Sequence, residues 1–148
     1  MIDDRIPVLI GAGQFTQHDV ELAQAKEPLE MLVEVARRAA ADAGADTRLL
    51  TRLDSVAVVS VLVWHCQNAP GLLAGRIGAQ PAQTVYSTVG GNTPQWMVNE
   101  TAAQIVAGRV RLALIAGVEA VHSLVLARRA NVKLQWTTGG SGSPTVVG

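Results

Sequence analysis

The sequence has little of what marks nucleic-acid binders and disulfide-stapled domains. Basic and acidic residues balance at 12 each, so no excess charge of one sign favours nucleic acid or forms an acidic tail. A single cysteine, Cys66, excludes an intramolecular disulfide framework and suits a reducing compartment. Stacking platforms for single-stranded nucleic acid are scarce, since the aromatic residues are only Phe15, Trp64, Tyr86, Trp96 and Trp136.

Signals for membranes, export and metals are also missing. Residues 1–5 are acidic where a signal peptide is basic. No apolar run approaches the roughly 20 residues that cross a bilayer. The histidines His18, His65 and His122 stand singly, and with one cysteine they show no metal-ligand spacing. We therefore expect a cytoplasmic protein with no membrane span, no metal and no cofactor of its own.

What the sequence does contain is ample material for a core. Hydrophobic residues make up 49% of the 148 residues and charged residues 16%, which suits one compact domain. Short apolar and β-branched runs predict buried strands at Pro7–Ile10, Val56–Val63, Thr84–Val89 and Leu112–Gly117.

Helical spacing of apolar residues separates these runs. The pattern is clearest over Pro28–Ala43, where Pro28 suits the first helical position and Gly44 the residue past the end. The helix predicted over Pro94–Ala107 is apolar on most sides, which is typical of burial on more than one face. Two shorter helices are predicted. One begins at Pro70 and runs to Ile77, and the other covers Val121–Arg129.

The resulting element order, βαβαβαβ followed by a last helix, predicts an α/β fold with a mostly parallel sheet and right-handed crossovers. Residues 1–130 form the predicted domain. Residues 131–148, rich in Gly and Ser, are predicted to be a flexible tail and the start of a linker. Ligands of such sheets bind at the carboxyl ends of strands, which directs attention to two glycine-containing turns.

The first turn is Gly11-Ala12-Gly13. A dinucleotide fingerprint needs a third glycine three residues on and a helix that opens at once. Thr16 occupies that position and a loop follows, so a tight turn after the first strand is the better interpretation.

The second turn, Gly90-Gly91-Asn92-Thr93, joins a predicted strand to a predicted helix. Backbone N–H groups at such a helix start can hold an anion or a developing oxyanion. The alternative is a plain turn in which glycine supplies unusual dihedrals. These four residues are the predicted substrate-binding set.

Other nucleophiles and bases have weaker support. Cys66 follows His65, but neighbours in sequence often point apart, so an ordinary loop cysteine is favoured. Glu119 is a lone carboxylate that we expect to order a loop by hydrogen bonding rather than act as a base. Ser87, Thr88 and Thr93 carry hydroxyls, but no base lies beside them in sequence.

The chain resembles the thiolase superfamily, specifically its N-terminal half. The resemblance rests on the strand Thr84–Val89, the helix from Pro94, Ala107-Gly108, the next strand and Gly117-Val118-Glu119. The opening Val8-Leu9-Ile10-Gly11-Ala12-Gly13, the helix from Pro28 and Asp54-Ser55-Val56 extend it over residues up to about 130.

The resemblance implies an acyl-CoA acyltransferase of lipid metabolism, similar to acetyl-CoA acetyltransferase, with a coenzyme A thioester as substrate. It also implies a second half or subunit that supplies the remaining active-site groups, and a homo- or hetero-oligomer. The family's spacing back from Gly117 assigns the nucleophile position to Gly91, which has no side chain to acylate.

Three functions therefore remain open. The first is a thiolase-like acyltransferase-family domain that is inactive alone. The second is a subunit of a thiolase-like retro-aldol lyase, in which backbone N–H groups near Asn92 stabilise an enolate. The third is a non-catalytic interaction module or truncated fragment.

Overall fold

A computed structural model describes residues 5–148. Four strands form one sheet in the order β3-β1-β2-β4, and every neighbouring pair is parallel. The bounds are β1 Ser55–Val58, β2 Gln83–Ser87, β3 Ala113–Ala116 and β4 Thr145–Val147. The predicted α/β fold with a parallel sheet is confirmed.

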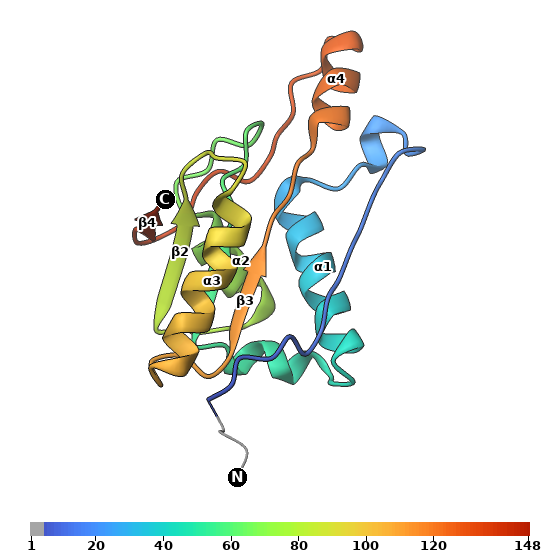
Figure 1. The fold of residues 1–148 in the computed structure, drawn as a ribbon. Coiled ribbons are helices and arrows are strands. Elements are labelled where there is room, and N and C mark those ends of the chain that lie inside the picture. The colour runs from blue at the N-terminus through green and yellow to red at the C-terminus, as the bar shows by residue number, and fades with distance from the viewer. Residues whose placement is uncertain (1–4) are drawn as a thin grey trace.

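Helices cover both faces of this sheet (Figure 1). On one side lie α1 and α2, and on the other side α3 packs against β3. Two 3-10 helices are also present: η1 lies in the loop predicted after Gly13, and η2 lies between α1 and β1. The bounds are α1 Pro28–Asp42, α2 Ala69–Ile77, α3 Thr93–Val106, α4 Val121–Arg129, η1 Leu22–Gln24 and η2 Thr47–Arg52.

Helix α1 begins and ends where its sequence indicates. Pro28 occupies the first turn, and the carboxylates of Glu27 and Glu30 bond reciprocally to each other's backbone N–H groups as a capping box. Gly44 follows the helix with φ of 69°, a left-handed conformation that glycine adopts at little cost.

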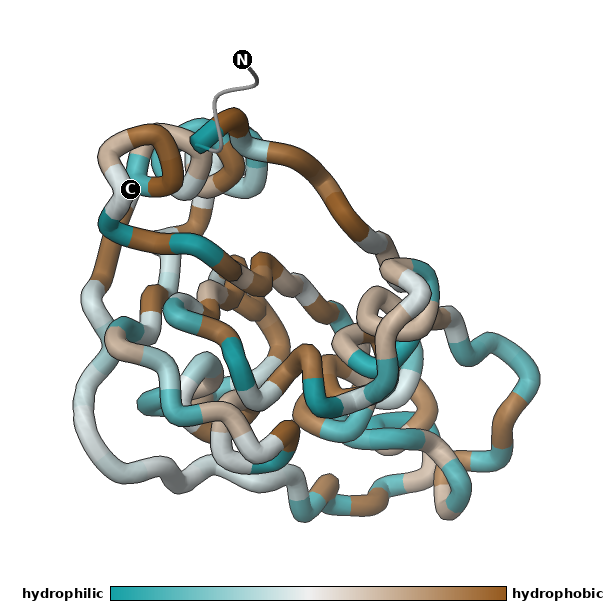
Figure 2. The backbone as a smooth tube through the Cα atoms, turned by 90° about the horizontal axis from the view of Figure 1, so that it is seen from below, coloured by the Kyte–Doolittle hydropathy of each residue, from teal (hydrophilic) through white to brown (hydrophobic). Residues whose placement is uncertain are grey.

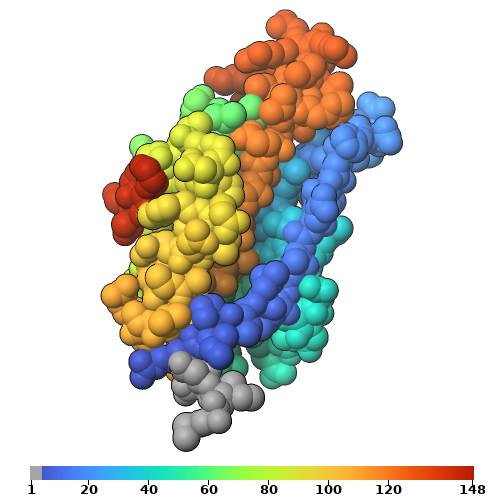
Figure 3. Space-filling view, in the orientation of Figure 1, coloured from blue at the N-terminus to red at the C-terminus, as the bar shows by residue number. Residues whose placement is uncertain are grey.

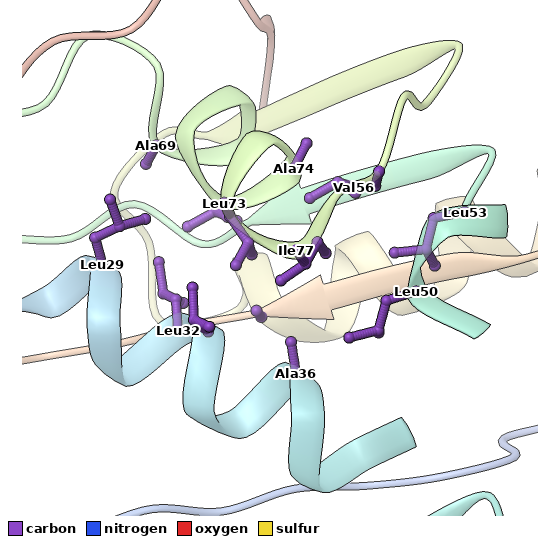
Figure 4. Close-up of a cluster of buried hydrophobic side chains, with 14 of the residues drawn as sticks. Leu29, Leu32, Ala36, Leu50, Leu53, Val56, Ala69, Leu73, Ala74 and Ile77 are labelled. Atoms are coloured by element: carbon purple, nitrogen blue, oxygen red, sulfur yellow. The ribbon is translucent and has the colours of Figure 1, made fainter. Parts of the chain in front are cut away.

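The apolar stripe of α1 lies on the hydrophobic core (Figure 4). Leu29, Leu32 and Ala36 are fully buried, and they face α2, η2 and β1. Burying one such leucine contributes about 1.5–3 kcal/mol relative to leaving it in water. This core holds α1 and α2 on the sheet, and it thereby fixes the positions of the loops at the strand ends.

The predicted first strand is not formed. Residues 6–11 pair with no strand, and Val8 and Leu9 are 71% and 88% exposed. Figure 2 shows these hydrophobic residues as an arc that stands apart from the rest of the backbone. The apolar composition was typical of a strand, but a strand also needs a hydrogen-bonding neighbour, and none of residues 5–148 pairs with this segment.

Strand β1 is shorter than predicted because it ends at Val58 instead of Val63. The backbone N–H groups of Ser60, Val61 and Leu62 donate to side chains rather than to a neighbouring strand. The β-branched run therefore leaves the sheet early and becomes a loop.

The segment that we predicted to be a flexible tail instead carries β4, which pairs with β2. The buried indole of Trp64 donates from Nε1 to the carbonyl of Thr137 at 2.6 Å. Asn68 is also buried, and its Nδ2 donates to the carbonyl of Ser141 at 2.7 Å. Composition indicated a flexible backbone, but it could not reveal that these buried donors need its carbonyl groups.

Helix α3 is less buried than its apolar circumference predicted. Only Thr93 and Met97 are buried, while Trp96, Val98 and Val106 are exposed. The helix packs against the sheet on one side, and nothing among residues 5–148 covers the other side. In the same part of the chain, no helix has the length and hydropathy to cross a bilayer.

Candidate functional site

The loops that follow β1, β2 and β3 meet around a cavity of about 500 Å³. Parallel strands place their carboxyl ends at one edge of the sheet, which explains why loops distant in sequence converge here. The volume lies within the range of small-molecule sites. The lining consists of Val59, Ser60, Leu62, Val89, Gly90, Gly91, Gly117, Val118 and Glu119.

Three side chains fix the loop after β1. The hydroxyl oxygens of Ser87 and Tyr86 accept from the N–H groups of Ser60 and Val61 at 2.8 and 3.2 Å. The carboxylate of Glu119 accepts from the N–H of Leu62 at 2.7 Å. Because these three N–H groups are already bonded, they cannot serve as an oxyanion hole.

Glu119 therefore orders a loop, as predicted, and Ser87 is a buried acceptor rather than a free nucleophile. Sequence reasoning missed Tyr86 and did not foresee the role of Ser87. The available signal was a pair of neighbouring hydroxyl residues at the end of the strand.

The predicted substrate-binding residues divide between the cavity and the start of α3. Gly90 and Gly91 line the cavity, while Asn92 precedes α3 and Thr93 is its buried first residue. The N–H of Thr93 donates to the carbonyl of Gly90 at 3.2 Å and closes the turn. Within residues 5–148, no hydrogen bond is described for the N–H groups of Gly91 and Asn92, so both can bind an anion.

The two glycines differ in the space around them. A Cβ added to Gly90 would approach Oγ1 of Thr93 to 2.6 Å, so a larger residue does not fit without a shift. A Cβ added to Gly91 would meet no atom within 4 Å. Position 91 could therefore hold a side chain. Because Gly91 has none, the cavity stays open at the start of α3.

Cys66 lies outside this cavity. Its thiol donates to the carbonyl of Gly139 at 3.7 Å, and burial raises the pKa of the thiol. His65 beside it is exposed. A raised pKa keeps the sulfur protonated at neutral pH, so Cys66 is a poor nucleophile.

Two of the histidines that stand apart in the sequence lie together in the structure, because the rings of His18 and His122 meet edge to face with centroids 6.4 Å apart. In the described part of the chain, no group of three or more His, Cys, Asp and Glu is arranged to hold a metal.

Gly11 and Gly13 form neither a dinucleotide loop nor a tight turn. A Cβ on Gly11 would collide with the carbonyl oxygen of Ala39, and one on Gly13 with that of Val35. Both glycines thus let the N-terminal segment lie directly on the backbone of α1.

Comparison with solved structures finds a likeness to a thiolase-like protein. No family model and no curated protein matches the chain. Among solved structures, a monomeric SCP2-thiolase-like protein type 1 from Mycobacterium smegmatis matches with a TM-score of 0.68 and 35% sequence identity. The match covers 79% of this chain and 24% of that chain, so this chain spans about a quarter of the length of that protein.

Proposed function

We propose that this chain, a thiolase-like domain by its fold and its sequence similarity, binds acyl-CoA as one part of an acyltransferase-family assembly. The assembly would resemble acetyl-CoA acetyltransferase and serve cytoplasmic lipid metabolism, with a second thiolase-like half or subunit as partner. The observation that carries the proposal is the cavity at three strand ends, with Gly91 at the start of α3. In the resemblance stated above, this is the position of the nucleophilic cysteine.

The same observation limits the chemistry of the isolated chain. A covalent acyl-enzyme needs a thiolate or an equivalent nucleophile, and Gly91 offers none. The hydroxyl of Ser87 is engaged with Ser60, and Cys66 lies outside the cavity. We therefore expect acyl-CoA to be held without acylation of the protein.

Isothermal titration of the chain with acetyl-CoA tests this proposal. Binding that weakens at least tenfold in Gly91→Trp, which blocks the cavity, would support it. Gly139→Trp is a matched control, because Gly139 also has no atom within 4 Å of an added Cβ and lies outside this cavity. Absence of binding, both alone and with a thiolase-like second half supplied, would refute the proposal.

A second candidate function is a retro-aldol lyase. It is favoured by the N–H groups of Gly91 and Asn92, which lie beside an open space and make no hydrogen bond among residues 5–148. In a retro-aldol lyase, the β-hydroxyl of a hydroxyacyl-CoA would pass its proton to a base of the partner half, the bond between the α and β carbons would break, a carbonyl product would leave, and the enolate would take up a proton to give the shortened acyl-CoA. The remaining enolate would receive hydrogen bonds from these two N–H groups. Release of an aldehyde or ketone from a β-hydroxyacyl-CoA by the complete assembly would distinguish lyase from acyltransferase activity.

A further inference from the structure

The rings of His18 and His122 meet on the surface of the molecule, away from the cavity at the strand ends. They lie edge to face, with their centroids 6.4 Å apart, and neither residue lines that cavity. Both residues are exposed. His18 lies in the loop before α1 and His122 lies in the first turn of α4, so the fold brings together two histidines that are far apart in the sequence.

The loop that carries His18 is closed by the side chain of Gln17. Its Nε2 donates to the carbonyl of Lys26, and its Oε1 accepts from the N–H of Lys26, both at 3.0 Å. The same Nε2 donates to the sulfur of Met31 in α1 at 3.5 Å. Residues 17–26 therefore form a compact loop whose ends are fastened together and to α1, and these bonds fix the backbone next to His18.

The helix that carries His122 packs against this loop. Helix α4 contacts η1, which lies within residues 17–26. In the space-filling view, the two segments meet at the upper edge of the molecule (Figure 3). Ser123 and Ala127 are the buried residues of α4, so His122 stands beside the packed side of the helix. Packing thus holds both backbones, while the exposed rings can turn.

The pair has the chemistry of a metal-ion chelate. Imidazole nitrogen is a ligand that Zn²⁺, Ni²⁺ and Cu²⁺ favour. Each nitrogen lies about 2.0–2.1 Å from a zinc ion, so two rings that share one at a tetrahedral angle have centroids about 5 Å apart. From their separation of 6.4 Å, the rings of His18 and His122 would turn and approach by roughly 1 Å. Exposed side chains make such a change by rotating about their χ angles.

We propose that His18 and His122 form a two-histidine site for a divalent transition-metal ion of the zinc, nickel and copper class. Among residues 5–148 no third His, Cys, Asp or Glu side chain joins them, so water or another added donor completes the coordination. A bound ion would fasten residues 17–26 to α4. Because α4 begins just after Glu119, the ion would also steady one loop of the cavity at the strand ends.

Zinc titration of matched histidine variants tests the site. Every chain carries Cys66→Ser, so that the thiol cannot bind the ion. We expect one equivalent of Zn²⁺ to bind when all three histidines are present. Binding should weaken by at least about tenfold in His18→Gln and in His122→Gln, because a single imidazole cannot chelate. His65→Gln is the matched control, since His65 is also exposed and lies outside the pair, and it should bind zinc as before.

Thermal unfolding and hydrogen exchange report the effect of the ion on the fold. Zn²⁺ should raise the Tm of the chain and slow the exchange of the α4 amides, because the two ligands come together only in the folded state. The same changes are expected in His65→Gln and are absent in His18→Gln. Mg²⁺ should produce neither change, since it prefers oxygen ligands.

The pattern across the three variants decides the proposal. Zinc binding that His18→Gln and His122→Gln both weaken, and that His65→Gln leaves intact, supports the site. No saturable binding, or binding that survives either substitution in the pair, overturns it. Equal losses in all three variants overturn it too, because the ion would then bind adventitiously at scattered histidines. None of these results depends on whether the chain binds acyl-CoA.

Discussion

Gly91 stands exposed before the first turn of α3, with room for a side chain. We expect Gly91→Cys, in a Cys66→Ser background, to change the free energy of unfolding by no more than about 0.5 kcal/mol. The new thiol would lie near a helix N-terminus, where the dipole lowers a thiol pKa. Iodoacetamide should therefore alkylate the thiol at position 91 faster at pH 7 than it alkylates Cys66 in the natural chain, as measured by mass spectrometry.

Equal alkylation rates would contradict this expectation. They would mean that position 91 is shielded from solvent or that its thiol gains nothing from the helix start.

Gly11 is a second position where one side chain decides the local packing. Gly11→Val would drive a side chain into the backbone of α1 at Ala39, and overpacking of this kind costs about 1–3 kcal/mol. Gly75→Ala is a control of opposite sign, because Gly75 is exposed inside α2 with open space around it. That change should stabilise the chain by about 0.5–1 kcal/mol. Urea unfolding of both variants checks the pair, and a neutral Gly11→Val would show that the segment does not rest on α1.

At the scale of elements, Asp54 ties the start of β1 to the start of β3. Its carboxylate accepts from the N–H groups of Arg111 and Leu112 at 2.9 and 3.2 Å. The bond from the Arg111 N–H is the main cause that lowers the pKa of this carboxyl. The carboxylate therefore stabilises the fold above its unfolded pKa of about 3.9, and this contribution is lost as the pH falls through the folded pKa.

We expect Asp54→Asn to destabilise the chain by about 1–2 kcal/mol at pH 6, and by less at pH 3.5. Urea unfolding at the two pH values measures this difference. Glu21→Gln is the control, because the Glu21 carboxylate makes no hydrogen bond among the described residues, and this change should leave the free energy of unfolding nearly unchanged. An equal loss in the free energy of unfolding at both pH values would mean that the carboxylate of Asp54 is not hydrogen-bonded in solution.

The elements that sequence predicted well are those whose signals are local. The helix from Pro28 carries its own caps and a complete apolar stripe, and it forms within one residue of the prediction. The strand at Pro7–Ile10 failed because pairing depends on a neighbour that composition cannot reveal. The same limit applies to the candidate site. Gly90 and Gly91 were found from the turn itself, whereas the hydrogen bonds that Tyr86 and Ser87 accept join residues 25 and 27 positions apart.

At the scale of the whole molecule, exposed apolar side chains stand out in two places among residues 5–148. They occur in the N-terminal segment at residues 6–10 and on α3 at Trp96, Val98 and Val106. The thiolase-like relative is named as a monomer, but its chain is far longer, so the parts that this chain does not span are available to cover such surfaces. Exposed apolar patches of this kind mark interaction sites or cause aggregation.

We expect the chain without a partner to self-associate as its concentration rises, because association removes these surfaces from water. Sedimentation velocity over a hundredfold concentration range measures the effect. Trp96→Gln combined with Val106→Lys should shift association to higher concentration if the α3 surface drives it. Leu9→Ser combined with Val8→Thr makes a matched change in the N-terminal segment. If neither pair alters the sedimentation of an associating chain, association proceeds through another face and both surfaces are tolerated in water.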